Sequence, residues 1–425
     1  MKGRIVLITL LLIALCAASP LRAEEPVTWS QCVTETRAAH PDLYSALAVL
    51  QQAEADKQIT GGALLPRLTT SFSASRSGAS EAGSVSSALY AWSLSAQQLF
   101  FDGHKTSNQV SSNSEAVKAA QFNYSAVSAN VRFALRSAFT ELLKAQDLVG
   151  LTREIAERRQ KNVRMINLRY QGGREHVGSL RQAQADLAQA EFEVSQAERG
   201  LLLAQSKLAS ALGRDVRSPF KVKGAYQVTE TSPVRPDLEL MARNNPLFQQ
   251  LEARSRAARY DLDASKSAFS PQLYLGSSLA RSAVDRWPFE GFDWNLGLTV
   301  SVPIYEGGSG RARVSRATAL LSQQNAELKS GYLQILDTLE SCWKSFQDAR
   351  QMVGVQKKYL DAAVERSTIA NAQYSNGLVT FNDWVIIENN LVNAKKSFLN
   401  AEANLLIAEA QWIQAKGGGL DAEKG

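Results

Sequence analysis

The sequence predicts a mainly α-helical protein that also carries a membrane β-barrel portion. One observation is a duplication, because shifting the 425-residue chain by 204 positions superimposes FFDGH at 100–104 on IYEGG at 304–308, and RYQGG at 169–173 on QYSNG at 373–377. The other is that each copy has two strand-like runs, then a proline-free helical stretch too long for a compact domain. The repeating unit is therefore strand, strand, long helix and returning helix.

Residues 1–23 have the layout of a cleaved secretory signal peptide. Lys2 and Arg4 precede an apolar run that is too short to span a bilayer comfortably. We expect cleavage after Ala23. Acylation of Cys16 is the alternative, which the large residues before that cysteine disfavour.

The composition of the exported chain excludes several classes of protein. Removing the signal leaves 44 basic and 41 acidic residues, a formal charge of +3, and no Lys/Arg patch interleaved with aromatic residues, so no nucleic-acid partner is expected. Cys32 and Cys342 remain, and spacing does not show whether they pair. Nothing after residue 23 approaches 18 uninterrupted apolar residues, so no membrane-spanning helix is expected.

Each copy begins with a helical segment and two strands. The helical segments are expected at about 29–58 and 235–268, and the strands at about 65–76, 89–101, 271–282 and 293–304. Runs of this length can cross a bilayer as tilted strands.

Apolar side chains occupy every second position of the strands, opposite small or polar ones. They are Trp92 and Leu94 in the first copy, and Trp294, Leu296, Leu298 and Val300 in the second. Taken alone, such alternation is typical of half of a soluble sandwich. No apolar segment is left to cover this face, so we interpret it as facing lipid. Four strands cannot close a barrel, and closure would therefore require several chains.

Each copy continues with two helices. The long helices are expected at about 104–170 and 309–374, roughly 100 Å each if continuous, and the returning helices at about 179–213 and 383–415. Both returning helices carry an apolar seam that repeats every 3.5 residues, with alanine at alternate seam positions. This pattern favours close coiling around neighbours over an ordinary amphipathic helix in a globular core.

These elements predict five segments along the chain. They are a signal peptide at 1–23, a first repeat at 24–213, a linker at 214–234, a second repeat at 235–415 and a flexible C-terminal tail at 416–425.

The signal peptide, the doubled strand pairs, the acidic-glycine turns after them and the two Y-x-x-G helical hairpins resemble the TolC family of outer-membrane efflux proteins. The resemblance runs from about Thr28 to Ala415. It implies a homotrimer, with a 12-stranded barrel in the Gram-negative outer membrane and an α-helical tunnel in the periplasm. It also implies contact with outer-membrane lipid, and connection to an inner-membrane pump through a periplasmic adaptor.

The resemblance implies that Tyr374 and Asp383 occupy closure positions at the periplasmic tip. A ring of three Asp383 carboxylates would narrow the pore and attract cations. The alternatives remain that Tyr374 only packs at a helix end and that Asp383 only caps a helix, as Ser179 would in the other hairpin.

Some relatives close the tip with an ionic lock between an arginine and an aspartate. The matching positions here carry Val379 and Ser179, so that lock is missing. Closure would then rest on Tyr374, with Arg174 or Glu175 as its neighbours.

The two hairpin turns are also where the resemblance places adaptor docking. Gly173 and Gly377 would supply the left-handed backbone that ends each long helix, and Leu378 and Val379 would give the second turn a hydrophobic tip. The alternative is a tight turn without a partner.

No active site, metal site or cofactor is expected, because the three histidines after the signal lie far apart and no nucleophile motif or paired zinc-ligand spacing occurs. The expected function is a passive exit duct of a tripartite efflux or type I secretion system. The main alternative is a periplasmic coiled-coil adaptor or scaffold without a pore, and a weaker one is a secreted hydrolase.

Overall fold

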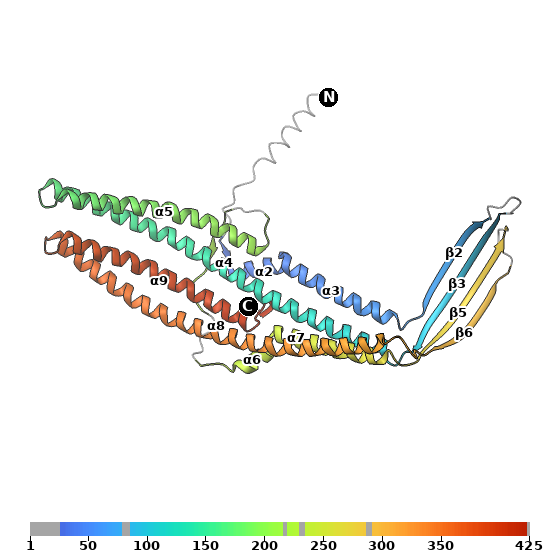
Figure 1. The fold of residues 1–425 in the computed structure, drawn as a ribbon. Helices are drawn as coiled ribbons and strands as arrows, with labels where there is room; N and C mark the ends of the chain where they lie inside the picture. Colours follow the sequence, from blue (N-terminus) through green and yellow to red (C-terminus); the bar gives the residue numbers. More distant parts are fainter. Residues whose placement is uncertain (1–25, 79–85, 216–218, 229–233, 286–290, 423–425) are drawn as a thin grey trace, which may run out of the picture.

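The computed structural model describes residues 26–78, 86–215, 219–228, 234–285 and 291–422. The expected signal peptide, with Cys16, lies outside these residues. The molecule is elongated, with a β-sheet at one end and the turns of two helical hairpins at the other (Figure 1). The C-terminus lies near the middle of its length.

The strands of both copies join in one antiparallel sheet. Its strands are β2 (Arg67–Ser77), β3 (Ser87–Phe101), β5 (Gln272–Val284) and β6 (Asp293–Ser301), in the order β2-β3-β5-β6. Since β2 and β6 are the outer strands, each has one backbone edge without a partner strand among the residues that the structure describes.

The predicted long and returning helices are confirmed to within a few residues. The long helices are α4 (Lys105–Gln171) and α8 (Ser309–Ser375), each of 67 residues and therefore about 100 Å long. The returning helices are α5 (Val177–Leu212) and α9 (Phe381–Ala415). Among the described residues, no helix combines the length and the apolar character needed to cross a membrane.

The prediction of one continuous helix at the start of each copy was wrong, because a proline divides each of them. The first copy has α2 (Trp29–Ala39) and α3 (Pro41–Gly62), and the second has α6 (Leu238–Asn244) and α7 (Pro246–Ser267). The residue before each proline is extended, with φ −73° and ψ 124° at His40 and φ −67° and ψ 132° at Asn245. Each proline then starts the next helix at its first position.

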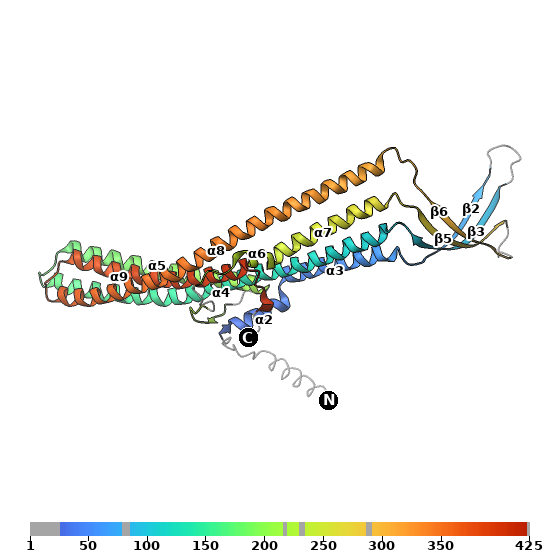
Figure 2. The same cartoon turned by 90° about the horizontal axis from the view of Figure 1, so that it is seen from below.

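Helix α4 is the central element of the helical body. It contacts α3 and α7 towards the sheet, and α5 and α9 towards the hairpin turns. Helix α8 diverges from α3 and α4 as it approaches the sheet, and α7 lies between α8 and α4 (Figure 2).

Three apolar clusters hold the helices together. The first joins α2, α4 and α5, the second joins α6, α8 and α9, and the third lies at the tip between the two hairpins. Cys32 lies in the first cluster and Cys342 in the second, and both are buried free thiols. They are therefore not paired.

The segments predicted as linker and tail both pack on the first cluster. Within 214–234, Phe220 is buried, and β4 (Val222–Lys223) pairs in parallel with β1 (Val27–Thr28). Within 416–425, where a flexible tail is expected, the structure describes residues up to 422. Leu420 of the 3₁₀ turn Leu420–Ala422 is 1% exposed, and its N–H donates to Ser128 Oγ at 3.0 Å. One apolar side chain and a few hydrogen bonds hold this segment against the first cluster. So few residues give no pattern from which the contact could be predicted from the sequence.

Candidate functional site

The tip is formed by two equivalent turns between the long and returning helices. Gly173 and Gly377 have φ of +70° and +75°, the left-handed conformation that glycine adopts at low cost. In both turns the following N–H bonds back to the last helical turn, from Arg174 to Arg169 O and from Leu378 to Gln373 O, each at 2.9 Å. The glycine N–H groups also donate, from Gly173 to Tyr170 O and from Gly377 to Tyr374 O, each at 3.0 Å. The two bonds in each turn make a Schellman motif, so the glycines end the helices as predicted.

The predicted capping residues of the returning helices were wrong by one turn. His176 caps α5, with Nδ1 accepting from Ser179 N–H at 3.3 Å, and Thr380 caps α9, with Oγ1 accepting from Asp383 N–H at 3.2 Å. Thr380 Oγ1–H also donates to Asp383 Oδ2 at 2.7 Å. Asp383 is thus in the first turn of α9, where a carboxylate favours the positive end of the helix dipole.

Tyr374 is buried in the cluster between the hairpins. Its ring stacks on Trp384, with centroids 4.6 Å apart and planes 7° apart, and only 1% of each side chain is exposed. Arg169 of α4, in the first hairpin, lies over the ring of Tyr374 at 4.6 Å and donates to Tyr374 O at 2.8 Å. Tyr374 at the end of α8 therefore contacts both its own hairpin and the first hairpin.

Glu175, in the first hairpin turn, accepts a hydrogen bond from the Tyr374 hydroxyl at 2.8 Å. Burial, followed by this bond, raises the pKa of Tyr374 above its usual value, so the phenol stays a neutral donor. Partial burial would raise the pKa of Glu175, but hydrogen bonds from Tyr374 and Ser179 lower it overall. Of the two expected neighbours of Tyr374, Glu175 is the one whose side chain the structure shows bonded to it.

An ion pair with a buried carboxylate, that of Glu388, lies farther from the tip than Trp384, by about one helical turn along α9. Arg158 of α4 donates to both carboxylate oxygens of Glu388 in α9, at 2.6 and 3.0 Å. Glu388 also accepts from Ser367 at 2.6 Å and from Asn371 at 3.1 Å, both on α8. Glu388 is 1% exposed, and two neighbouring helices, α4 and α8, supply the partners that offset the desolvation of its carboxylate.

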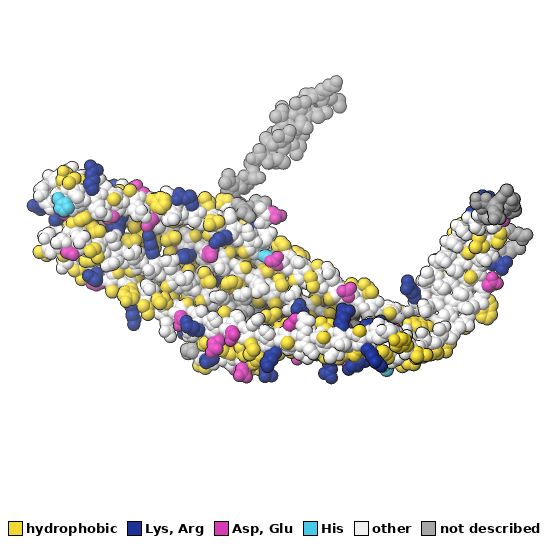
Figure 3. Space-filling model, viewed as in Figure 1, with side chains coloured by type: hydrophobic (Ala, Val, Ile, Leu, Met, Phe, Trp, Pro, Cys, Tyr) yellow, Lys and Arg dark blue, Asp and Glu magenta, His cyan; other side chains and the backbone are white. Residues whose placement is uncertain are grey.

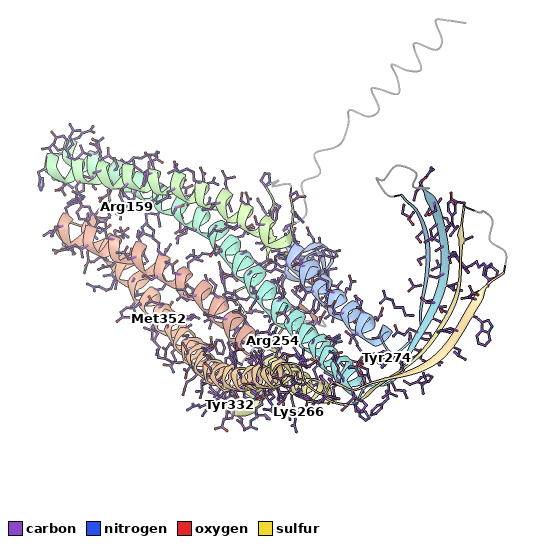
Figure 4. The ribbon with its side chains drawn as sticks, turned by 45° about the vertical axis from the view of Figure 1, so that its right-hand side comes forward. Arg159, Arg254, Lys266, Tyr274, Tyr332 and Met352 are labelled. Carbon is purple, nitrogen blue, oxygen red and sulfur yellow. The ribbon has the colours of Figure 1, made fainter. Side chains whose placement is uncertain are left out.

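Further polar contacts join the same helices. Arg159, labelled on α4 in Figure 4, bonds to Asn389 of α9, and Lys395 of α9 pairs with Glu154 of α4 at 2.5 Å. Trp384 Nε1–H donates to Asn371 at 2.8 Å. Charged groups are otherwise spread over the helical surface (Figure 3).

The remaining predicted tip residues differ in exposure. Leu378 is 75% exposed at the end of the second turn, whereas Val379 is half-buried and packs on the tip cluster. Asp383 is exposed. The described chain therefore presents Leu378 and Asp383 outward, while Tyr374 and Val379 face other side chains of the same chain.

The strand register gathers the predicted lipid-facing residues on one face of the sheet. Trp294 pairs with Leu279, Leu279 with Leu94, and Phe72 with Trp92. Residues opposite one another point to the same face, so one apolar face runs across all four strands. Arg281, opposite Trp92, and Arg76, four residues beyond Phe72, are charged exceptions near the loops, and Arg281 pairs with Asp293 at 3.7 Å.

The middle of the other face of the sheet is made of small and polar residues, whereas Leu89 opposite Val284 and Leu99 opposite Tyr274 lie towards its ends. Ser71 pairs with Ser93, Ser95 with Ser278, and Ser278 with Asn295. The apolar face is open in the single chain, where Trp294 is 77% and Leu298 62% exposed.

Sequence reasoning missed Arg158, Ser367, Asn371, Trp384 and Glu388. The signal for Glu388 was an acidic residue between Trp384 and Leu391 on the apolar side of α9, which requires a buried partner. No local signal identified Arg158, because its partner lies 230 positions away. Over the described ranges, no group of His, Cys, Asp or Glu side chains could hold a metal ion.

Comparison with known proteins supplies relatives of the whole chain. The sequence model of the family described as outer membrane efflux protein matches residues 32–214 and 238–418, one match per repeat. The pyoverdine export outer membrane protein OpmQ of Pseudomonas aeruginosa is 23% identical over 404 residues, covering 90% of this chain and 83% of OpmQ. The alkaline protease secretion protein AprF of the same species is 23% identical, covering 74% and 69%.

Solved structures show the same fold. CusC superimposes with a TM-score of 0.82 at 18% identity, over 94% of this chain and 96% of CusC. VceC of Vibrio cholerae superimposes with a TM-score of 0.79 at 20% identity, over 92% and 96%.

Proposed function

The chain belongs to the outer membrane efflux protein family, and from that membership we propose that it is the passive exit duct of a tripartite efflux or type I secretion system. An inner-membrane pump would drive the substrate, and a periplasmic adaptor would join the pump to the tip of this protein. Names of relatives include pyoverdine export and alkaline protease secretion, which correspond to these two kinds of system.

The sheet supports assembly as a homotrimer. Its outer strands β2 and β6 each leave a backbone edge unpaired within the described part of the chain, and such an edge cannot face hydrocarbon. Pairing β6 of one copy with β2 of the next would satisfy both edges. Three copies would then close a barrel of twelve strands, in which the apolar face contacts outer-membrane lipid and the serine-rich face lines the pore.

The tip supports a closed end held by Tyr374 and narrowed by Asp383. The bond from Tyr374 to Glu175 joins the two hairpins of one copy, and the stacking of Tyr374 on Trp384 holds the Tyr374 ring within the second hairpin. Exposed Asp383 carboxylates from three copies would form an acidic ring. The exposed Leu378, beside Gly377 and near Gly173, would offer the adaptor an apolar contact at the extreme end.

One observation carries the proposal: a single apolar sheet face, uncovered in the chain, at the end opposite two polar helical turns. It disfavours the coiled-coil adaptor alternative, whose strands would need their own soluble core. The function also requires no catalytic group.

The test is single-channel recording of the purified full-length protein in planar lipid bilayers. We expect discrete channels that prefer cations, and we expect Asp383→Asn to lower the cation-to-anion permeability ratio about twofold or more at 0.1 M salt, where the screening length is about 10 Å. Asp383→Glu, the matched control that keeps the charge, should retain the preference. Absence of any channel would favour the adaptor alternative, and an unchanged ratio in Asp383→Asn would leave Asp383 with a helix-end role only.

A further inference from the structure

Helix α9 carries a file of exposed polar residues that begins at Asp383. Steps of three and four residues from Asp383 lead along one face of the helix, first past the exposed apolar Ile386 and then only to exposed polar residues, which are Asn390, Asn393, Ser397, Asn400 and Asn404. We call Asn390, Asn393, Asn400 and Asn404 the carboxamide file. From Asp383 to Asn404 the face extends about 32 Å.

The opposite side of α9 makes its apolar contacts. Leu391, Leu405 and Trp412 are buried there against the neighbouring helices. Packing the carboxamide file against another helix would bury amides that need partners, at a cost of about 1–3 kcal/mol for each unsatisfied group. The file is therefore better suited to water than to a protein interface.

The part of the carboxamide file farther from Asp383, Asn400 and Asn404, borders a groove between α9 and α5. Helix α4 forms the floor of this groove, which has a volume of about 660 Å³, with Leu148 and Thr152 among its floor residues. Asn400 and Asn404 stand on the α9 wall, and Gln196 stands on the α5 wall. The order of the three helices, with α4 between the two walls, is visible in Figure 1.

The duplication places carboxamides on both walls. A shift of 204 positions relates Asn400 to Gln196, and Asn393 to Gln189. All four are exposed. The same chemistry at equivalent positions of two helices indicates a shared solvent-facing surface, since nothing in the packing of either helix requires it.

The charges along the groove largely cancel. Lys396 of α9 pairs with Glu193 of α5 at 2.6 Å across the groove, and Lys207 of α5 pairs with Glu141 of α4 at 3.0 Å. Lys144 adds one positive charge. The walls are thus rich in hydrogen-bonding groups and nearly neutral.

We propose that the carboxamide file and the groove beside it form the wall of the conduit directly inside the Asp383 ring. This inference rests on the proposed function, because the face of α9 that carries Asp383 is assigned to the pore only through the proposed Asp383 ring. The amide groups both donate and accept hydrogen bonds without charge. Hydrophilic solutes of either sign would therefore pass along this stretch with little discrimination, and charge selection would be confined to Asp383.

The test introduces single thiols into a full-length background in which the two buried cysteines are replaced, Cys32→Ala with Cys342→Ala. Asn400→Cys and Asn393→Cys place a thiol on the proposed wall. Glu157→Cys is the control, because five residues beyond Thr152 it lies on the opposite, exposed side of α4. Each variant is treated in planar bilayers with positively and with negatively charged thiol reagents, and labelling is measured by mass spectrometry.

We expect the two reagents to shift the conductance of the Asn400→Cys channel in opposite directions, by about 1.5-fold or more at 0.01 M salt, where the screening length is about 30 Å. Asn393→Cys should behave in the same way, and Glu157→Cys should be labelled without a shift.

Two results would overturn the inference while leaving the channel intact. One is labelling of Asn400→Cys and Asn393→Cys without any change in conductance, or a shift only in Glu157→Cys. The other is failure to label both wall thiols, which would mean that another helix fills the groove. A background protein that forms no channels at all would instead contradict the proposed function.

Discussion

The helical tip and the sheet lie at opposite ends of the molecule and satisfy their side chains in different ways. At the tip, Tyr374, Trp384 and Glu388 are each 1% exposed, and all find partners within the chain. In the sheet, the large apolar side chains of β6 are more than half exposed, and the strands are held together by backbone bonds with a few side-chain bonds such as Ser71 to Ser93. The tip is therefore complete in a single copy, whereas the sheet depends on its surroundings.

The strongest test of a self-contained tip is Arg158→Ala. It leaves the Glu388 carboxylate buried without its cation, which typically costs about 3–5 kcal/mol. We expect hydrogen exchange of residues 367–391, which include the start of α9, to become about 100-fold faster or more. The matched control is Lys395→Ala, which removes a pair whose glutamate is exposed and should cost about 1 kcal/mol or less. Equal effects of the two changes would mean that the buried pair is not what joins the hairpins.

The dependence of the sheet on its surroundings can be tested with a charge on each face. Leu298→Arg places a cation on the proposed lipid face, where it should cost about 2–4 kcal/mol near the middle of the membrane. Thr299→Arg places the same cation one residue along, on the polar face. We expect Leu298→Arg to lower the urea midpoint of the protein in lipid vesicles much more than Thr299→Arg. Equal losses would contradict a lipid-covered face.

A smaller effect should come from the bond between Tyr374 and Glu175. The pKa of Glu175 is lowered in the folded protein, so its stabilising contribution is present above the unfolded pKa of about 4.3 and is lost as the pH falls through the lower folded value. Tyr374→Phe removes the donor. A hydrogen bond to a carboxylate stabilises the folded state by about 1.5 kcal/mol or more. Because Glu175 is only half-buried, we use this lower value.

The measurement compares hydrogen exchange of residues 374–384 in the wild type and in Tyr374→Phe at the same pH, so that the intrinsic exchange rate cancels. We expect the variant to exchange about tenfold faster at pH 7, and the ratio to fall towards one at pH 3. A ratio that does not change with pH would show that Glu175 does not contribute through its charge.

Much of the architecture could be predicted from the sequence because it is encoded locally or by repetition. Period-two alternation predicted all four strands, a 3.5-residue seam predicted the returning helices, and Gly173 and Gly377 predicted both turns. Caps were less certain, since His176 and Thr380 lie within three residues of the predicted Ser179 and Asp383.

What the sequence determined by itself is thus the four strands of the large sheet with their two faces, and the long and returning helices with their approximate lengths, since these follow from periodicity along the chain. Only the tertiary structure decided that Arg158 meets Glu388, that Tyr374 reaches Glu175, that Leu420 closes the first cluster, and that a groove opens between α5 and α9. Such contacts join residues far apart along the chain, and their energies depend on burial and direction, which no local pattern records.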